Sequence, residues 1–293
     1  MWKVLFIENT NRCNLHCPGC KRFYSNEQDM SEEVYEATLS TFSVEPIDTV
    51  SFFWRGEPTL DKRLPEWVER AKSLGYKTYT STNTATPFLH HRGYVSRLLD
   101  SLDRICICVD GYDQESVARY RQGSNWRTII KNLETIASVE TECKKEMRTL
   151  MFKYNEGHED DFIRMAKKYK MDTLNLGLPI INGHRVLNKT EADIWLADNK
   201  KYRRYKMVNK QWVHKSHIGC SMIPIISASG EIAPCCYDWK IEHSLGNVLY
   251  DSLETINKNV ERAWIQAQKK KFSMCKRDCF IANTGVNVIQ QLK

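Results

Sequence analysis

The sequence predicts an α/β protein built on an incomplete barrel of six β/α units, a partial (β/α)6 barrel, with a small cysteine-rich domain behind it. Apolar segments typical of β-strands alternate with helical periodicity from residue 3 to about residue 180, which is the order of a parallel sheet covered by helices. From about residue 217 this alternation stops and cysteines accumulate. We therefore expect a barrel over residues 1–180, a basic connector over 181–216 and a cysteine-rich domain over 217–293.

Six segments of the barrel have the composition of β-strands. They are Val4–Glu8, Thr49–Trp54, Lys77–Ser81, Arg104–Val109, Met147–Lys153 and Thr173–Gly177. Between them apolar residues recur at helical spacing, first from Leu64 to Leu74, where Asp61 is placed to cap the helix and Gly75 to end it. Further helical stripes cover 129–137 and 162–169. Because ligands bind beyond the carboxyl ends of parallel strands, the loops at those ends are the candidate site.

The remainder of the chain predicts three further elements. The seven Lys and Arg residues between positions 199 and 215, without Asp or Glu, indicate a connector or a helix crossing between domains. A hairpin is expected from Ile223–Ser227 and Glu231–Pro234, joined by a turn that contains Gly230. A last helix is expected over Glu254–Gln268.

Composition excludes several classes of protein. The 293 residues are 42% hydrophobic and 27% charged, and no apolar run approaches the length of a membrane span. The opening segment begins a strand and has no signal-peptide cleavage site, and the net charge of +7 suits acidic or phosphorylated partners. Eleven cysteines at metal-ligand spacings indicate metal binding in the reducing cytoplasm rather than disulfides.

The first cysteine cluster is a CxxxCxxC motif formed by Cys13, Cys17 and Cys20, directly after the first predicted strand. Three thiolates in one short loop can hold a cubane cluster and leave its fourth iron without a protein ligand. An open coordination position is what a catalytic metal requires. The alternative is a structural zinc knuckle with His16 as its fourth ligand.

Further motifs follow this loop, and with them the chain resembles the radical S-adenosylmethionine (SAM) superfamily over nearly its whole length. The similar segments are Trp54-Arg55-Gly56-Glu57-Pro58 (the family's GGEP), Thr82-Asn83 (TN(G)) and Cys108-Val109-Asp110-Gly111 (S-x-D-G). The resemblance implies that SAM binds the open iron of a [4Fe–4S] cluster. One electron, from a donor such as flavodoxin or ferredoxin, then cleaves SAM to a 5′-deoxyadenosyl radical.

The resemblance also implies which residues bind the cofactor, namely Gly56, Glu57, Asn83, Cys108 and Arg121. Glu57 and the backbone beside it receive the SAM amino group, Arg121 its carboxylate, and Cys108 takes the place of a ribose-binding serine. Two residues depart from the family pattern: Arg55 replaces the first glycine, and Gly19 replaces an aromatic residue near adenine. The structural alternatives are a helix cap for Glu57, a loop residue for Asn83 and a turn for Asp110.

The second cysteine cluster resembles the SPASM domain family in a shortened, twitch-like form. Cys220, Gly230 and Cys235 match its CX9–15GX4C opening, and a late pair supplies two further thiols. The ligands implied for one auxiliary [4Fe–4S] cluster are Cys220, Cys235, Cys275 and Cys279. Zinc bound by four thiolates is the alternative, and Cys236 or His217 can replace a ligand.

Cys106 and Cys108 lie two residues apart on the fourth strand and share a face with Asp110. These three are the catalytic candidates, because a thiol near a substrate radical can return a hydrogen atom to it. The alternative is that both thiols pack as small buried hydrophobes.

The leading hypothesis is hydrogen abstraction from an unactivated carbon, followed by oxidation, epimerisation or rearrangement of a small-molecule, nucleotide or peptide substrate. Because the sequence begins at the barrel, we expect no leader-binding module before it, and this expectation makes a small-molecule or nucleotide substrate more competitive. The basic stretch, with three aromatic residues among its cations, suggests a phosphate-bearing or nucleic-acid substrate as one alternative. The non-enzymatic alternative is a zinc-stapled nucleic-acid-binding protein.

Overall fold

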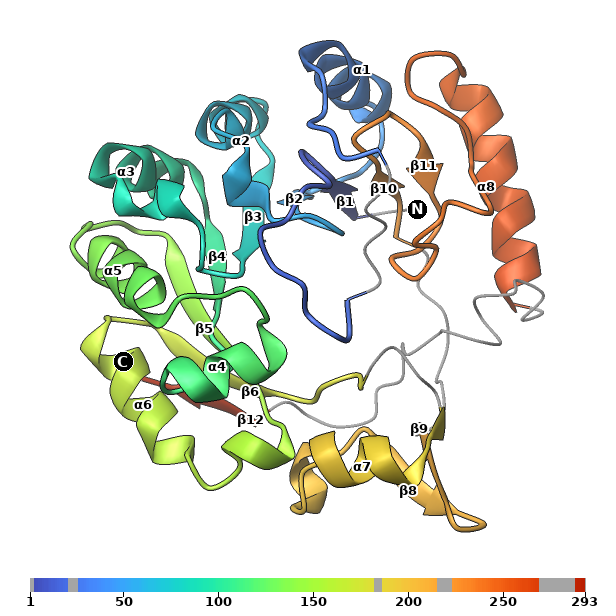
Figure 1. Cartoon of the computed structure of the whole chain (residues 1–293). Helices are drawn as coiled ribbons and strands as arrows, with labels where there is room; N and C mark the ends of the chain where they lie inside the picture. Colours follow the sequence, from blue (N-terminus) through green and yellow to red (C-terminus); the bar gives the residue numbers. More distant parts are fainter. Residues whose placement is uncertain (1–2, 21–25, 182–185, 215–222, 269–287, 293) are drawn as a thin grey trace.

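The computed structural model describes residues 3–20, 26–181, 186–214, 223–268 and 288–292, and its centre is a curved sheet of nine strands (Figure 1). Their order across the sheet is β11-β10-β1-β2-β3-β4-β5-β6-β12. The strands are β1 (Val4–Ile7), β2 (Thr49–Phe52), β3 (Lys77–Thr82), β4 (Arg104–Cys108), β5 (Lys144–Leu150), β6 (Thr173–Gly177), β10 (Ile225–Ile226), β11 (Ile232–Ala233) and β12 (Val288–Gln291).

The six strands β1 to β6 are parallel neighbours in chain order, which confirms the predicted series of β/α units. At one edge β10 pairs with β1 in parallel and β11 with β10 antiparallel, and at the other β12 pairs with β6 antiparallel. Within the described ranges the sheet does not close between β11 and β12. The predicted incomplete barrel is confirmed.

Helices cover the convex face of this sheet, with α1, α2, α3, α5 and α6 side by side (Figure 1). The α-helices are α1 (Glu32–Phe42), α2 (Leu64–Ser73), α3 (Arg92–Ser101), α4 (Gln114–Tyr120), α5 (Trp126–Ala137), α6 (Glu159–Lys168), α7 (Lys189–Trp195) and α8 (Leu253–Gln268). Short 3-10 turns are η1 (Pro58–Leu60), η2 (Pro87–His90), η3 (Lys153–Asn155) and η4 (Lys200–Tyr202). No helix in the described ranges is long and apolar enough to cross a bilayer.

The predicted apolar stripes form the core. On α2 the buried residues include Trp67, Val68 and Ala71, and on α5 they include Ile129 and Leu133. Each large apolar side chain buried in this way contributes about 1.5–3 kcal/mol relative to exposure. Packing of these stripes against the sheet fixes the positions of the strand ends.

The fifth strand is displaced from its prediction, Met147–Lys153. It begins at Lys144 and ends at Leu150, and η3 starts at Lys153. The start was hidden because Lys145 and Glu146 are polar residues that the fold buries, at 6% and 5% exposure. Glu146 accepts hydrogen bonds from Arg148 and Asn175 and also pairs with Arg104, and these partners allow a charged residue to lie inside the sheet.

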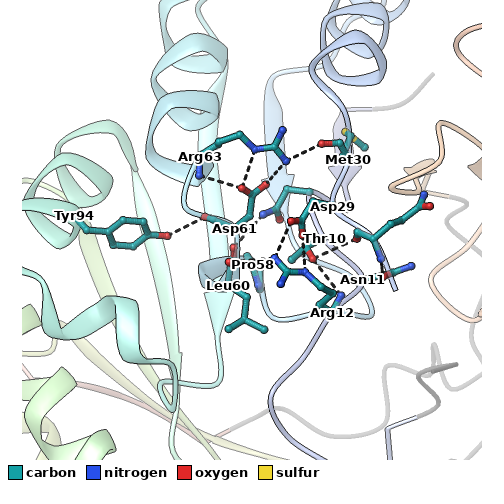
Figure 2. A network of polar contacts seen from close by, with 12 residues as sticks. Thr10, Asn11, Arg12, Asp29, Met30, Pro58, Leu60, Asp61, Arg63 and Tyr94 are labelled. Carbon is teal, nitrogen blue, oxygen red and sulfur yellow. Dashed lines mark hydrogen bonds and ion pairs between the residues drawn. The ribbon is translucent and has the colours of Figure 1, made fainter. Parts of the chain in front are cut away.

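The predicted cap of the first helical stripe is also wrong. Asp61 ends η1, and its carboxylate accepts the Arg63 backbone N–H (Figure 2). Arg63 is the N-cap residue of α2, which begins at Leu64. Asp61 also pairs with the Arg63 guanidinium, with Nε and Oδ1 3.0 Å apart. Gly75, with φ of +90°, ends the helix as predicted.

The basic stretch forms a hairpin rather than a helix. A three-stranded antiparallel sheet contains β7 (Val186–Leu187), β9 (Gln211–His214) and β8 (Tyr205–Val208) in that order. The hairpin expected near residue 230 is confirmed as β10 and β11, and the last helix as α8, one residue longer at its start. Because β10 pairs with β1, this hairpin extends the barrel sheet.

A buried ion pair joins the ends of β1 and β2 to the chain beyond β11. The Arg55 Nε and Nη2 atoms donate to the two carboxylate oxygens of Glu8 at 2.8 and 2.6 Å. The Glu8 side chain is fully buried and also accepts the Ala228 backbone N–H. Arg55 Nη1 donates to the carbonyl of Trp239 at 2.9 Å. One residue therefore ties three separate segments together.

Replacement of Arg55 tests this tie. The Arg55→Met substitution leaves the Glu8 carboxylate buried without its counter-charge, and we expect a loss of about 3–5 kcal/mol in unfolding free energy. The measurement is thermal and denaturant unfolding of the anaerobically prepared protein. Arg70→Met is the matched control, because Arg70 pairs with Glu36 on the surface and its loss should change little. Equal shifts in both variants would contradict the role given to Arg55.

Candidate active site

The predicted site residues of the barrel lie at one end of the sheet. The CxxxCxxC loop follows β1, Gly56 and Glu57 follow β2, Asn83 follows β3 and Asp110 follows β4. All are at the carboxyl ends of parallel strands, where ligands of such sheets bind. The structure thus places these motifs at the same end of the sheet, and their assignment to one SAM site stays a prediction.

Polar contacts outside the three thiols anchor the cysteine loop. Arg12 and Asp29 form an ion pair with 2.7 Å between Nη2 and Oδ2, and Thr10 accepts the Arg12 backbone N–H (Figure 2). Further along, Asn14 Nδ2 donates to the carbonyl of Ala85 at 2.9 Å. The loop is therefore fixed at its start and in its middle.

The three thiols differ in exposure. Cys13 and Cys17 are half-buried, whereas Cys20 is exposed. Asn83 Nδ2 lies 3.7 Å from the Cys13 sulfur, and the Cys20 N–H donates to the Cys17 carbonyl at 3.0 Å. Burial raises the pKa of the Cys17 thiol, while the hydrogen bond and charge of Arg121 act in the opposite direction.

The donor set of this loop fits an iron–sulfur cluster. No group of three or more His, Cys, Asp or Glu side chains in the described ranges could hold a single metal ion. A cubane cluster makes a different demand, because each of its thiolates binds a separate iron and the sulfurs need not meet at one point. Three thiols within eight residues, two of them in electrostatic contact, meet that demand.

Gly56 brings the loop after β2 against the cysteine loop. A Cβ atom there would lie 2.1 Å from the carbonyl oxygen of Thr10, so no other residue fits. The next residue, Glu57, donates its backbone N–H to the Arg12 carbonyl at 2.7 Å. The close approach of the Thr10 carbonyl therefore explains why glycine is required at position 56.

The Glu57 carboxylate is turned toward the end of β3. It accepts hydrogen bonds from the hydroxyls of Thr59 and Thr82 and from the backbone N–H groups of Thr59 and Asn83, at 2.6–3.1 Å. It is only 3% exposed, and burial raises its pKa although all four donors favour the ionised form. Glu57 caps η1, the alternative considered for it, and its contact with SAM stays a prediction.

Asp110 and Arg121 form a second buried ion pair, with 2.6 Å between Oδ2 and Nε. Asp110 has no exposed surface and its other oxygen accepts the Leu150 N–H at 2.7 Å. The turn between them is tight, because a Cβ at Gly111 would lie 2.2 Å from the Val117 nitrogen. Arg121 also hydrogen-bonds to Cys17, and this contact places a cation beside the cysteine loop.

Steric crowding also explains the glycine at position 19, where the family usually has an aromatic residue. A Cβ at this position would lie 2.8 Å from the Tyr120 hydroxyl oxygen. Tyr120 is fixed by ring contacts with Phe152 and Trp195. An aromatic residue, which is usual in the family at this position, would collide with Tyr120.

Cys106 and Cys108 share one face, as predicted, with 3.7 Å between their sulfurs. Cys106 is fully buried, in line with the alternative that it packs as a small hydrophobic residue. Cys108 is half-buried, with its sulfur 3.5 Å from the Ser81 hydroxyl. The hydrogen bond between the two thiols lowers the pKa of Cys106 and raises that of Cys108. Of the two, Cys108 is the more accessible thiol.

The second cysteine cluster is only partly described. Cys220, Cys275 and Cys279 lie outside the described residues, and so does the alternative ligand His217. Cys235 is buried and Cys236 half-buried, and the carbonyl of Cys236 accepts the Trp54 indole N–H at 3.2 Å. A hydrogen bond with Cys236 and burial both raise the pKa of Cys235. The choice between these two thiols stays open.

The basic stretch does not form a single charged face. Lys201 lies 3.8 Å from the Glu159 carboxylate and Arg203 lies 3.8 Å from that of Asp198, so carboxylates outside the stretch offset part of the charge. Arg204 points inward and donates to a backbone carbonyl at 2.6 Å. The described part of the stretch, which excludes Lys215, is therefore partly neutralised by carboxylates that lie outside it.

The polar interior beside the two thiols was not predicted from the sequence. Glu146 and Arg148 alternate on β5 and face Cys106 and Cys108 across the sheet. The signal was present as two charged residues at a spacing of two within a parallel strand, which is normally apolar.

Two family models match the chain. The model described as the radical SAM superfamily matches residues 7–166, and the one described as an iron–sulfur cluster-binding domain matches residues 220–280. These matches imply a SAM-binding [4Fe–4S] cluster and an auxiliary iron–sulfur cluster, as the motifs predicted.

Curated relatives match parts of the chain. A GTP 3′,8-cyclase of Clostridium botulinum is 24% identical over 190 residues, 62% of this chain and 58% of that protein. A tungsten-containing aldehyde ferredoxin oxidoreductase cofactor-modifying protein of Pyrococcus furiosus is 33% identical over 84 residues, 28% of this chain and 24% of that protein. The matches thus span less than two thirds of either relative.

Solved structures share the fold over almost all of the chain. Native anSMEcpe with bound AdoMet has a TM-score of 0.60 at 16% identity, covering 97% of this chain and 93% of that one. BtrN in complex with AdoMet and 2-DOIA has a TM-score of 0.55 at 12% identity, covering 98% and 97%. Streptococcus suis SuiB bound to S-adenosylmethionine has a TM-score of 0.63 at 14% identity, covering 96% and 71%.

Proposed function

This chain belongs to the radical SAM superfamily and is an enzyme with an iron–sulfur domain behind its barrel, and we propose that it abstracts hydrogen from an unactivated carbon. The substrate class is a small molecule, a nucleotide or a peptide, and the outcome is oxidation, epimerisation or rearrangement. The observation that supports this most is the convergence of the CxxxCxxC loop, Asn83 and the Arg121–Asp110 pair at one end of the sheet.

The chain's own residues have separate tasks in this proposal. Cys13, Cys17 and Cys20 hold the catalytic [4Fe–4S] cluster, which when bound with SAM supplies the 5′-deoxyadenosyl radical. Arg121 binds the SAM carboxylate while Asp110 holds its guanidinium in place. Glu57 positions Asn83 through the backbone, and Asn83 contacts the cysteine loop.

The remaining cofactor and partners follow from the same chemistry. Cys220, Cys275 and Cys279 with Cys235 or Cys236 hold one auxiliary [4Fe–4S] cluster. A one-electron donor such as flavodoxin or ferredoxin reduces the enzyme, and thiolate-bound clusters suit a reducing compartment such as the cytoplasm.

The structure bears on the alternatives. Membership of an enzyme superfamily sets aside the non-enzymatic zinc protein. Modification of a nucleic-acid base loses support, because two of the three aromatic residues of the basic stretch, Tyr202 and Tyr205, are buried and cannot stack on bases. A nucleotide remains within the proposed substrate class.

Removal of the catalytic ligands tests the proposal. After anaerobic reconstitution the enzyme should hold about eight irons per chain and release 5′-deoxyadenosine from SAM when reduced. Changing Cys13, Cys17 and Cys20 together to Ala should remove about half of this iron and all of the 5′-deoxyadenosine. The control is Cys143→Ala, which removes a buried thiol outside the site. Continued SAM cleavage by the triple variant would refute the proposal.

Arg121 is tested by the affinity for SAM. Loss of a charge-assisted contact typically costs about 1.5–3 kcal/mol, so Arg121→Gln should weaken SAM binding by roughly 10- to 100-fold. The dissociation constant is measured by equilibrium dialysis, with circular dichroism as the check on folding. Arg119→Gln is the matched control, because Arg119 is exposed in the last turn of α4, two residues before Arg121. An unchanged dissociation constant in Arg121→Gln removes this residue from the SAM site.

We further propose that Cys108 donates a hydrogen atom to the substrate radical when the outcome is epimerisation. The S–H bond breaks and a C–H bond forms, leaving a thiyl radical that one electron and one proton, from the reductant and solvent, restore. Product formed in heavy water should then carry deuterium, because thiols exchange with solvent. Mass spectrometry should show that the label is lost in Cys108→Ala and kept in Cys106→Ala. Absence of solvent deuterium from the wild-type product would exclude both thiols.

A further inference from the structure

The interior of the barrel beside Cys108 holds more positive than negative charge. Register pairs Cys108 on β4 with Arg148 on β5, and Arg148 with Asn175 on β6, so the three form one row across the sheet. The neighbouring Glu146 is the carboxylate of this region and is 6% exposed in its side chain. It pairs with both Arg148 and Arg104.

A third guanidinium enters from outside the barrel. Arg204, in the turn before β8, donates through Nε to the carbonyl of Leu178 at 2.6 Å. Burial lowers its pKa, and the positive charge of Arg148 lowers it further, so these two guanidinium groups interact. No carboxylate in the described ranges forms an ion pair with Arg204.

The charges in this region do not balance. Glu146 is shared between Arg148 and Arg104, whose side chain is 51% exposed and reaches water, and Asp110 is already paired with Arg121. With Cys106 as a neutral thiol, the charge of Arg204 therefore has no carboxylate counterpart among the described residues. An uncompensated charge is costly in a protein interior, and a ligand of opposite sign removes that cost.

Two buried atoms in the same row also have no partner in the described part of the chain. Arg148 Nε is a buried donor, and Asn175 Oδ1 is a buried acceptor. Buried polar groups are normally hydrogen-bonded, so the unpaired Arg148 Nε indicates a ligand that accepts a hydrogen bond there, while Asn175 Oδ1 calls for a donor group on the same ligand. The guanidinium fork is well suited to an oxygen anion, which it can bind through two parallel N–H groups.

We infer that Arg148 and Arg204 bind an oxyanion of the substrate, a carboxylate or a phosphate, next to Cys108. The inference rests on the proposed function only in placing the reacting substrate inside the barrel. It narrows the substrate to small molecules or nucleotides with an anionic group near the carbon that reacts. In this inference Arg204 is the residue of the basic stretch that binds substrate. The other described cations of the stretch lie on the surface or in peripheral ion pairs.

The test is anion binding to the full-length, anaerobically reconstituted protein saturated with SAM. Inorganic phosphate and acetate are titrated separately by calorimetry at constant ionic strength. Comparing the two distinguishes a site for a phosphate from a site for a carboxylate. Saturable binding of either is expected, tighter for the group that the substrate carries. Arg148→Gln and Arg204→Gln should each weaken it about tenfold or more, and Arg148→Lys should weaken it less. Lys206→Gln, an exposed cation on β8, is the matched control and should leave binding unchanged.

Three results would overturn the inference. One is the absence of saturable binding of both anions, and another is an equal loss in Lys206→Gln. The third is competition between phosphate and SAM, because the arginines would then belong to the SAM site. Reductive SAM cleavage by the unaltered protein is measured separately, so that the proposed function and the anion site can fail independently.

Discussion

The buried pair of Glu8 and Arg55 is the constraint on which the rest of the site depends. Glu8 comes immediately after β1, and the cysteine loop begins a few residues later, so the direction in which the chain leaves the strand fixes the loop. A carboxylate without exposed surface needs a partner of opposite charge. Arg55 provides it from the end of β2 and, through the Trp239 carbonyl, extends the same connection to the cysteine-rich region. The family's first glycine is thus replaced by a residue that joins the two parts of the enzyme.

Two further buried carboxylates, at neighbouring strand ends, are likewise held by donors from other segments of the chain. Glu57 is held by four donors, two from Thr59 and two at the end of β3, and Asp110 by Arg121 and a backbone N–H of β5. Each carboxylate connects its own loop to the next strand or helix. The surface that faces the cysteine loop is therefore rigid, which is what precise placement of a reactive radical requires.

Prediction from the sequence was most accurate where a residue pattern is compatible with only one local structure. The six strands, the helical stripes and the cysteine loop after β1 were all predictable, because apolar periodicity and motif spacing determine them. It was least informative where polar residues enter the interior. The start of β5 was hidden by Glu146, and the partner of Arg55 is 47 positions away in the chain. Arg204 looked like part of a surface run, and only the fold shows that it points inward.

The most direct test of the account is electron paramagnetic resonance of the reduced, reconstituted enzyme with and without SAM. If Cys13, Cys17 and Cys20 hold a cluster with an open iron, SAM should change the signal of that cluster and leave that of the auxiliary cluster unchanged. The changed component should be missing when these three cysteines are replaced. A colourless protein that contains zinc and gives no such signal, or a cluster signal indifferent to SAM, would contradict the account.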